Sequence, residues 1–388
     1  MLELLFLLLP IAVAYGWYMG QRSARLDKEN LGHKLSRNYV AGINFLLSEQ
    51  PDKAVDLFIE MLQVDEETLE THLALGNLFR QRGEVERAIR IHQNLVARPH
   101  LTYEQRNLAM LELARDFIAA GLLDRAESIL PELVKDSEHE ESAANLLIDI
   151  YQQMREWDKA IAVAERSKRK LGNKVIPSIA HFYCEQAEQL LKAQEQKKAI
   201  YKLKRALQTD DHCIRARLML ARAYWQQHNA DLAIETLQPL PTLDADFAPE
   251  ALPLLLECLS EQDETELGVI LQQWLQQTHA ASVLLALADE QEKLLGRAAA
   301  EQLVLDELKR HPTMKGFHRL IRYQLAEARS QEARESLGLL ASLVQEQINV
   351  KPVHRCRRCG FSSRVIFWQC PSCKGWGTIK PIRGLDGE

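Results

Sequence analysis

The sequence predicts an all-α protein, a superhelical solenoid of about nine helix pairs. The main observation is a small residue that recurs at intervals of 32 to 39 residues. These markers are Ala54, Ala88, Ala126, Ala160, Ala199, Ala233, Gly268, Ala300 and Ala333. A second observation is that large apolar residues flank the markers at helical spacing, as Tyr224 and Leu237 flank Ala233. Chance does not keep such a period over nine units, so the chain is an array of helical repeats.

The unit at residues 214–247 shows the pattern most clearly. Leu220, Ala221 and Tyr224 precede Ala233 in the order that is typical of a tetratricopeptide repeat (TPR). Such a repeat consists of a helix, a tight turn and a second, antiparallel helix in about 34 residues. Small residues are needed where the two helices cross closely, and bulky residues fill the gaps around the crossing. The predicted architecture is therefore a TPR solenoid.

Length and charge are consistent with such an array. At 388 residues the chain exceeds what one compact core usually holds, and repeats answer this limit by stacking. The net charge of −6 conceals an asymmetry. Residues 351–388 contain eight Lys or Arg against two acidic residues, a net +6, which leaves −12 for the other 350 residues. A basic C-terminal segment thus follows an acidic array, and it could dock on that array or on an acidic partner.

Residues 1–21 predict a single transmembrane helix. No charged residue occurs from Leu4 to Gln21, a length that can just span a hydrocarbon core of about 30 Å. A cleaved secretory signal is disfavoured, because Glu3 precedes the apolar stretch and no good cleavage site follows it. A buried core helix is the other alternative, but no nearby segment would cover so uniform a surface. Basic residues follow the span and none precedes it, so the N-terminus is expected outside and the rest of the chain in the cytoplasm.

After a charged connector at residues 22–34, we divide the array into two segments. Residues 35–247 form about six regular units, and residues 248–347 form degenerate units beyond a Pro-rich joint. Polar residues on the first helices are candidates for a groove that binds a peptide or protein, although each could be an ordinary solvated position: Asn38, Asn77, Arg80, Arg115 and Arg217. The scattered histidines show no metal-ligand spacing: His72, His92, His181, His212 and His279. We expect three single cysteines to pack as small buried apolar groups: Cys184, Cys213 and Cys258.

The chain contains none of the common catalytic patterns. There is no Walker A loop, no dinucleotide-binding glycine pattern, no G-x-S-x-G and no H-E-x-x-H. The carboxylates fall at spacings that are typical of charge pairs on helix surfaces. We therefore predict that the protein is not an enzyme and that its array offers a binding surface.

Residues 351–388 predict a small metal-binding domain. Cys356-x2-Cys359 and Cys370-x2-Cys373 are separated by ten residues, and two such turns that face each other supply four thiolates in a tetrahedron. The residues leave zinc and iron both open as the single ion per chain. A pair of disulfides is the alternative, but it needs an oxidising compartment, which the predicted cytoplasmic location argues against.

The role of this domain has three alternatives. The C-P-S-C turn with nearby aromatic residues is typical of rubredoxin, where iron carries electrons, and of zinc ribbons, some of which bind nucleic acid. Four basic residues could contact phosphate: Arg357, Arg358, Arg364 and Lys374. The same charges could hold the domain against the acidic array. We favour this docking, or another protein contact, over nucleic-acid binding and electron transfer.

The order of the three parts closely resembles the lipopolysaccharide assembly protein B family (LapB, also called YciM) of Gram-negative bacteria. The residues that carry the resemblance are the apolar span Leu4–Gly20, the markers from Ala54 to Ala333, and the four cysteines of the C-terminal domain. The resemblance covers the whole chain. It implies a single-pass inner-membrane adaptor on the cytoplasmic side, with a periplasmic N-terminus and no catalysis of its own.

The resemblance also implies partners and ligands. Such proteins work with the membrane protease FtsH to promote degradation of LpxC, the deacetylase that commits carbon to lipid A, and PbgA/YejM (LapC) restrains them. The metal role passes to Cys356, Cys359, Cys370 and Cys373, whereas no groove residue is transferred. The rival functions are a general scaffold that assembles lipopolysaccharide enzymes at the membrane, and a redox protein. The oligomeric state, a homo-oligomer included, and the angle between the two array segments stay open.

Overall fold

The computed structural model describes residues 69–260 and 264–388, together with residues 17, 19, 40–45, 53 and 57. The predicted anchor at residues 1–21, apart from two positions, the connector at 22–34 and the marker Ala54 lie outside the described residues. Among the residues that are described, no helix is both long enough and apolar enough to cross a bilayer. The predicted domain boundaries stay predictions.

The chain forms two compact units, residues 1–150 and 151–388, and each is described by itself. Within residues 69–150, the part of the first unit that is described continuously, there are two helix pairs and the start of a further helix. The pairs are α4 (Leu69–Gln81) with α5 (Val85–Val96), and α6 (Tyr103–Ala119) with α7 (Leu123–Leu133). Helix α8 (Glu140–Met154) begins in this unit. The side chains between α4, α5 and α6 form a buried apolar cluster: Leu69, Leu73, Leu95 and Ala109.

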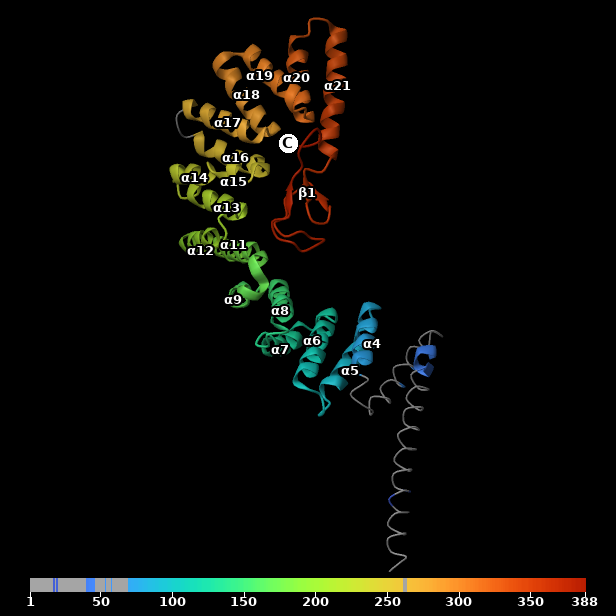
Figure 1. The fold of residues 1–388 in the computed structure, drawn as a ribbon. Coiled ribbons are helices and arrows are strands. Elements are labelled where there is room, and N and C mark those ends of the chain that lie inside the picture. The colour runs from blue at the N-terminus through green and yellow to red at the C-terminus, as the bar shows by residue number, and fades with distance from the viewer. Residues whose placement is uncertain are drawn as a thin grey trace, which may run out of the picture. The chain divides into compact units, whose positions relative to one another are not determined.

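The second unit continues the array and ends in a small sheet. Its longer helices are α9 (Trp157–Arg166), α11 (Ile176–Lys192), α12 (Gln196–Thr209), α13 (Ile214–Trp225), α14 (Ala230–Leu237), α16 (Ala248–Leu259), α17 (Glu264–Thr278), α18 (Ala281–Leu295), α19 (Arg297–Arg310), α20 (Met314–Glu327) and α21 (Gln331–Val350). Short turns of helix lie between them: α10 (Lys168–Leu171), η2 (Gly172–Val175), α15 (Leu240–Leu243) and η3 (Ala245–Phe247). Figure 1 shows helices α11 to α20 following one another along an arc, with the C-terminal strands on its inner side beside α21.

The C-terminal sheet has three short antiparallel strands in the order β2-β1-β3. These are β1 (His354–Cys356), β2 (Ser362–Ser363) and β3 (Ile379–Pro381). In the central strand, His354 lies opposite both Ser363 and Pro381, and Cys356 lies opposite Ile379. The mostly helical TPR array with a small C-terminal ribbon agrees with the predicted fold class.

Small residues lie at the helix crossings, as the period predicts. Six markers are each the fourth residue of the second helix of a pair and are fully buried: Ala88, Ala126, Ala160, Ala199, Ala233 and Ala300. The side chain of alanine is a single methyl group, so the two helix axes can approach closely. The prediction is confirmed at these positions.

Two weaker markers differ from this pattern. A β-carbon added at Gly268 would meet nothing within 4 Å, so no close crossing requires glycine there. The buried contacts of α17 come from Ile270, Leu271 and Trp274 further along the helix. Ala333 is only half-buried, because α21 belongs to the last helix pair and has a neighbouring pair on one side alone.

The turn inside each of the first five described helix pairs uses one residue in the left-handed region. Gly83 and Gly121 take this role with φ values of 81° and 73°. In the next three pairs Arg155, Gln194 and His228 take it, with φ between 58° and 61°. Glycine adopts this region without strain, whereas a residue with a β-carbon loses roughly 1–2 kcal/mol there. In the three pairs without glycine, packing of the two helices therefore holds the turn in this conformation. A search of the sequence for glycine alone would miss these three turns.

Gly76→Ala should destabilise the first unit. A β-carbon at Gly76 would lie 2.4 Å from Nε2 of His92, whose ring is fully buried and whose Nδ1 contacts Asp116. The ring has nowhere to move without breaking that contact. We expect the free energy of unfolding to fall by about 1–3 kcal/mol, measured by urea denaturation followed by circular dichroism.

Gly268→Ala is the matched control, since it adds the same methyl group inside a helix where the space is open. It should leave the free energy of unfolding unchanged or raise it by up to about 1 kcal/mol, because alanine is the better helix former. Equal effects of the two substitutions would show that Gly76 does not lie at a close crossing.

Candidate metal centre and the surface it packs on

Two turns of similar geometry carry the four cysteines of the C-terminal domain. In the first, the amide of Gly360 donates to the carbonyl oxygen of Cys356 over 3.0 Å, and Gly360 has φ of 80°. In the second, the amide of Lys374 donates to the carbonyl oxygen of Cys370 over 2.9 Å, and Lys374 has φ of 56°. Each turn thus reverses the chain tightly just after its first cysteine, so that both thiols of the turn join one cluster.

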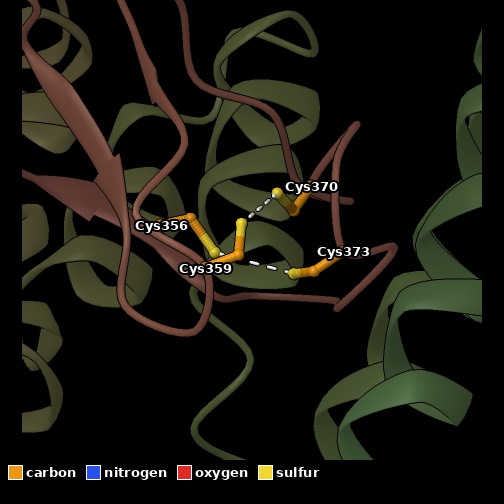
Figure 2. A group of neighbouring side chains, drawn as sticks. All are labelled: Cys356, Cys359, Cys370 and Cys373. Carbon is orange, nitrogen blue, oxygen red and sulfur yellow. Dashed lines mark hydrogen bonds between the residues drawn. The ribbon is translucent and has the colours of Figure 1, made fainter.

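The four sulfur atoms lie within 4.8 Å of one another. Figure 2 marks two of the pairs, with 3.7 Å between the sulfurs of Cys356 and Cys373 and 3.6 Å between those of Cys359 and Cys370. A tetrahedral zinc site with bonds of about 2.3 Å requires sulfur atoms about 3.8 Å apart. The donor set and its spacing therefore fit one zinc or iron ion.

The surroundings of the thiols affect their charge. Burial acts to raise the pKa of Cys356, but a hydrogen bond with the hydroxyl group of Thr378 and hydrogen bonds from backbone amides lower it to about 6. Its sulfur lies 3.4 Å from the hydroxyl oxygen of Thr378 and 3.4 Å from the amide nitrogen of Arg358. A backbone hydrogen bond also lowers the pKa of Cys359, whereas burial raises the pKa of Cys370 to about 11. Thiolates are thus favoured on the first turn, and a bound cation would displace the proton of Cys370.

The domain has little apolar core of its own. Its buried cluster consists of Cys356, Cys370 and Ile379, with Phe361 and Cys373 packed against it. Domains this small usually need a metal, a disulfide or a partner to fold. The domain therefore depends on its thiol cluster and on the array that it contacts.

Two tryptophans pack the domain against the array. The Trp376 ring stacks on the His181 ring with 5.1 Å between centroids and 23° between planes, and its Nε1 donates to Oε1 of Gln152 over 2.7 Å. The Trp368 ring stacks on the Phe247 ring at 5.8 Å and 18°. Large aromatic rings of this kind bury much apolar area and often provide most of the energy of an interface. We call the array residues that contact the domain the docking surface: Gln152, His181, Asp244, Asp246, Phe247, Glu250, Thr278, Ser282 and Lys315.

Opposite charges meet across the docking surface. Lys380 Nζ lies 2.7 Å from Oδ2 of Asp244. The carboxylate of Asp246, whose side chain is 18% exposed, contacts both Arg357 and Arg383. Networks of partly buried charges contribute more than isolated surface pairs. Of the two possibilities that the charge of this segment left open, the array or an acidic partner, the structure shows docking on the array.

The side chain of Glu388 binds at the N-terminus of helix α18. The carboxylate of Glu388 accepts hydrogen bonds from the amide of Ser282 over 2.9 Å and from its hydroxyl over 2.7 Å, and it contacts Lys315. Ser282 is the second residue of α18, where the helix dipole favours an anion. In strand β1, His354 Nε2 lies 2.7 Å from Oε1 of Glu250 in α16. The domain is therefore fixed to α16, α18 and α20 through polar contacts as well as through its aromatic rings.

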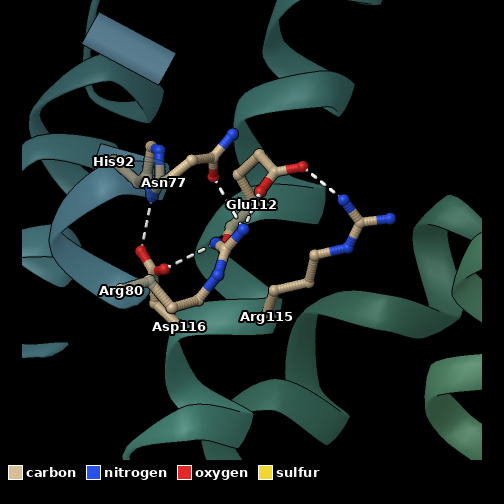
Figure 3. Close-up of polar contacts among 6 residues, drawn as sticks. All are labelled: Asn77, Arg80, His92, Glu112, Arg115 and Asp116. Atoms are coloured by element: carbon tan, nitrogen blue, oxygen red, sulfur yellow. Dashed lines mark hydrogen bonds and ion pairs between the residues drawn. The ribbon is translucent and has the colours of Figure 1, made fainter. Parts of the chain in front are cut away.

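A second polar cluster lies in the first unit. Figure 3 shows its six side chains from α4, α5 and α6: Asn77, Arg80, His92, Glu112, Arg115 and Asp116. Arg80 donates to Oδ1 of Asp116 over 2.8 Å, to Oε2 of Glu112 over 2.7 Å and to Oδ1 of Asn77 over 2.7 Å. Arg115 donates to the second oxygen of Glu112 over 2.5 Å and keeps 38% of its side chain exposed. Three of the five candidate groove residues therefore meet in one cluster, and Arg115 is the most accessible of its charged members.

The remaining candidates lie elsewhere. Asn38 is outside the described residues, and Arg217 donates to the backbone oxygen of Asp211 over 3.0 Å. Cys184, Cys213 and Cys258 are buried, as predicted. Gln152 and the buried carboxylates around Arg80, Glu112 and Asp116, were not among the residues predicted from the sequence. Each lies on the first helix of a pair, which could have marked it as a groove residue, but many solvated residues share that position.

Acid should weaken docking through His181. Burial of its imidazole, with the neighbouring charge of Arg215 adding to the effect, lowers its pKa from 6.5 to about 3. The undocked state binds the proton more readily, so each pH unit below 6.5 should weaken docking by up to about tenfold until pH reaches about 3. Above pH 6.5 this contribution should be constant. Hydrogen-exchange mass spectrometry of residues 351–388 between about pH 7.5 and 5.5 measures the effect.

His181→Phe is the matched control, because it keeps an aromatic ring under Trp376 and removes the titrating group. We correct the measured hydrogen-exchange rates of residues 351–388 for the pH dependence of intrinsic amide exchange. In this variant, the corrected protection should no longer fall between about pH 7.5 and 5.5. The same pH dependence in both proteins would contradict the assignment to His181.

Known families and proteins match the chain along its length. The family described as rubredoxin metal binding domain matches residues 354–381, and tetratricopeptide repeat families match residues 71–102 and 185–258. The crystal structure of MamA protein is similar with a TM-score of 0.33 at 20% identity, over 47% of this chain and 96% of that chain, a likeness too low to support any argument.

Two curated relatives cover nearly the whole chain. Lipopolysaccharide assembly protein B of Escherichia coli strain K12 is 47% identical over 388 residues, which is 100% of either chain. The protein of the same name from Haemophilus influenzae is 42% identical over 396 residues, with 98% of either chain covered. Identity at this level over the full length shows common descent of all parts of the chain. The chain belongs to the lipopolysaccharide assembly protein B family.

Proposed function

We propose that this chain is an inner-membrane-anchored cytoplasmic adaptor that regulates lipopolysaccharide biosynthesis by promoting FtsH-dependent proteolysis of the LpxC deacetylase. The observation that carries the proposal is its 47% identity, over its whole length, to a protein named lipopolysaccharide assembly protein B. The finer role follows from the physical character of the parts. A helical repeat array offers an extended surface for proteins, and a membrane anchor at residues 1–21 would confine that surface beside a membrane protease.

Confinement is the means by which such an adaptor acts. If the array binds LpxC while its anchor lies near FtsH, the second encounter becomes intramolecular, and its rate rises without any new chemistry. PbgA/YejM (LapC) would restrain the adaptor by competing for the anchor or the array. The chain itself transforms no substrate in this proposal.

The client surface is proposed on the first unit. In the second unit, residues 351–388 already cover the docking surface. The face of α4 and α6 instead carries the cluster around Arg80, in which Arg115 keeps an accessible charge. Arginine is enriched at protein interfaces because its planar group pairs with carboxylates and packs on apolar surface. This face is therefore the best candidate for a client segment with acidic residues.

We further propose that Cys356, Cys359, Cys370 and Cys373 bind one zinc or iron ion with a structural role. The ion would provide the folding energy that the small core of the domain lacks. By ordering the domain, the ion would hold Trp368 and Trp376 in the positions in which they pack on the array. The domain would thus brace the degenerate part of the array.

Cys356→Ser combined with Cys359→Ser should remove the metal and release the domain from the array. The loss of two of four ligands leaves no closed site, so residues 351–388 should exchange amide hydrogens rapidly while the helical circular dichroism of the array stays nearly unchanged. Metal content is measured on the same samples. Cys258→Ala, which removes a buried thiol in α16, is the control and should keep both metal and protection. Retained protection of residues 351–388 in the double variant would show that no metal is needed.

The adaptor role is tested by the lifetime of LpxC. In Escherichia coli cells depleted of their own family member, LpxC should be long-lived, and expression of this chain should shorten its half-life. Arg115→Ala should lengthen it again, since loss of an interface contact worth about 1–2 kcal/mol weakens client binding roughly 5- to 30-fold. Arg217→Ala, also on a first helix, is the matched control and should behave like the unaltered chain. An LpxC half-life that does not respond to this chain would contradict the adaptor and favour a general scaffold for lipopolysaccharide enzymes.

A further inference from the structure

Two histidines that lie far apart in sequence meet at one carboxylate in the second unit. The Nδ1 atom of His279 lies 3.0 Å from Oε1 of Glu307, and the Nδ1 atom of His311 lies 2.9 Å from the same oxygen. The two imidazole rings stack, with 4.1 Å between their centroids and 25° between their planes. One candidate ligand atom from each residue lies within 4.8 Å of the others. The spacing of 32 residues between the histidines follows no known ligand pattern, so the sequence analysis found no site here.

We infer that His279, Glu307 and His311 form a second metal site, distinct from the four cysteines, for a divalent transition-metal ion such as Zn²⁺. Two imidazole nitrogens and one carboxylate oxygen are a donor set that zinc binds readily, with a fourth position left for water. Imidazole donors favour Zn²⁺, Ni²⁺ or Cu²⁺, whereas Mg²⁺ and Ca²⁺ prefer oxygen donors alone.

The observed spacing is close to what an ion requires. Bonds of about 2.0–2.1 Å in a tetrahedral site separate the ligand atoms by about 3.3–3.4 Å. The two nitrogen–oxygen distances are 2.9 and 3.0 Å, so the atoms would separate by about 0.3–0.5 Å on binding. The two stacked rings would also turn relative to each other, so that both Nδ1 lone pairs point at the ion. On binding, each neutral imidazole would keep its proton on Nε2 and offer the Nδ1 lone pair.

The backbone holds all three ligands before any ion arrives. His311 directly follows the last residue of α19, and Glu307 lies one turn earlier, so both project from the same end of that helix. His279 directly follows α17, with φ of 51°, and its amide donates to the carbonyl oxygen of Leu275 over 2.8 Å. Glu307 has only 12% of its side chain exposed, whereas each histidine has 44% exposed and can be reached from solvent.

Electrostatics also favours a cation here. The ligands lie at the C-terminal ends of α17 and α19, where the helix dipoles present partial negative charge, and Glu307 adds a full one. One residue before His279, the carbonyl oxygen of Thr278 accepts a hydrogen bond from Arg383 over 3.1 Å. An ion at this site would therefore hold His279 directly beside Thr278, a residue of the docking surface.

The test counts zinc ions bound to the full chain without a polyhistidine tag. The cysteine cluster is first loaded with one equivalent of Zn²⁺, and a second equivalent is then titrated by calorimetry with metal analysis of the dialysed product. We expect two ions per chain. His279→Asn with His311→Gln should weaken the second binding event by more than about tenfold, since even groups that merely support a ligand contribute 10- to 100-fold. Asparagine is chosen because it tolerates the left-handed backbone of residue 279. Glu307→Gln should show the same loss.

His212→Gln is the matched control, because His212 lies exposed beside Asp211 in another group that could hold an ion. It should keep the second ion at unchanged affinity. The melting temperature in excess Zn²⁺ provides an independent measure, since an ion that binds only the folded state raises it. That rise should be absent in the double histidine variant, whereas both proteins should melt alike before the second equivalent is added. A single ion per chain, an unchanged second ion in the double variant, or its loss from His212→Gln would each overturn the inference.

Discussion

No helix pair in this chain can bury its own apolar face, and this constraint organises the rest of the structure. Stacking covers most of that face, and it works because a small residue stands at nearly every crossing: Ala88, Ala126, Ala160, Ala199, Ala233 and Ala300 are fully buried. Stacking leaves part of the first helices and of the connections between the pairs without cover from a neighbouring pair. In the second unit the C-terminal domain packs on residues of both kinds, such as His181 in α11 and Phe247 in η3.

The C-terminal domain and the docking surface bury apolar side chains against each other. With Cys356, Cys370 and Ile379 as its buried cluster, the domain has too little core to be stable without support. An ion among the thiols would supply local order, and the stacking of Trp376 on His181 and of Trp368 on Phe247 adds apolar burial that neither side could provide alone. The carboxylates of Asp244 and Asp246 then set its orientation, since they meet Lys380, Arg357 and Arg383. A membrane adaptor built this way would use one half of its array to hold the domain and the other half to hold a client.

Much of this could be predicted from the sequence, because repeats and ligand spacing are local patterns. The period of small residues indicated the helix pairs, and the two C-x-x-C turns indicated the thiol cluster. The uneven charge indicated that the basic end docks on the array or on an acidic partner. The failures have a physical origin as well. At Gly268 the pattern matched, but the space beside it is open, since nothing in one sequence tells a glycine that packing requires from one that it tolerates. Contacts such as Trp376 with Gln152 or His279 with His311 join residues that are far apart in the sequence, and only the folded backbone brings them together.

The central claim is that residues 351–388 pack on the docking surface of the second unit, and zero-length crosslinking tests it most directly. A carbodiimide joins an amine to a carboxylate only when the two are in contact. Lys380 Nζ lies 2.7 Å from Oδ2 of Asp244, so mass spectrometry of the monomeric product should find a crosslink between these two residues within one chain. Efficient reaction of Lys380 with other carboxylates, and none with Asp244 or Asp246, would contradict the account.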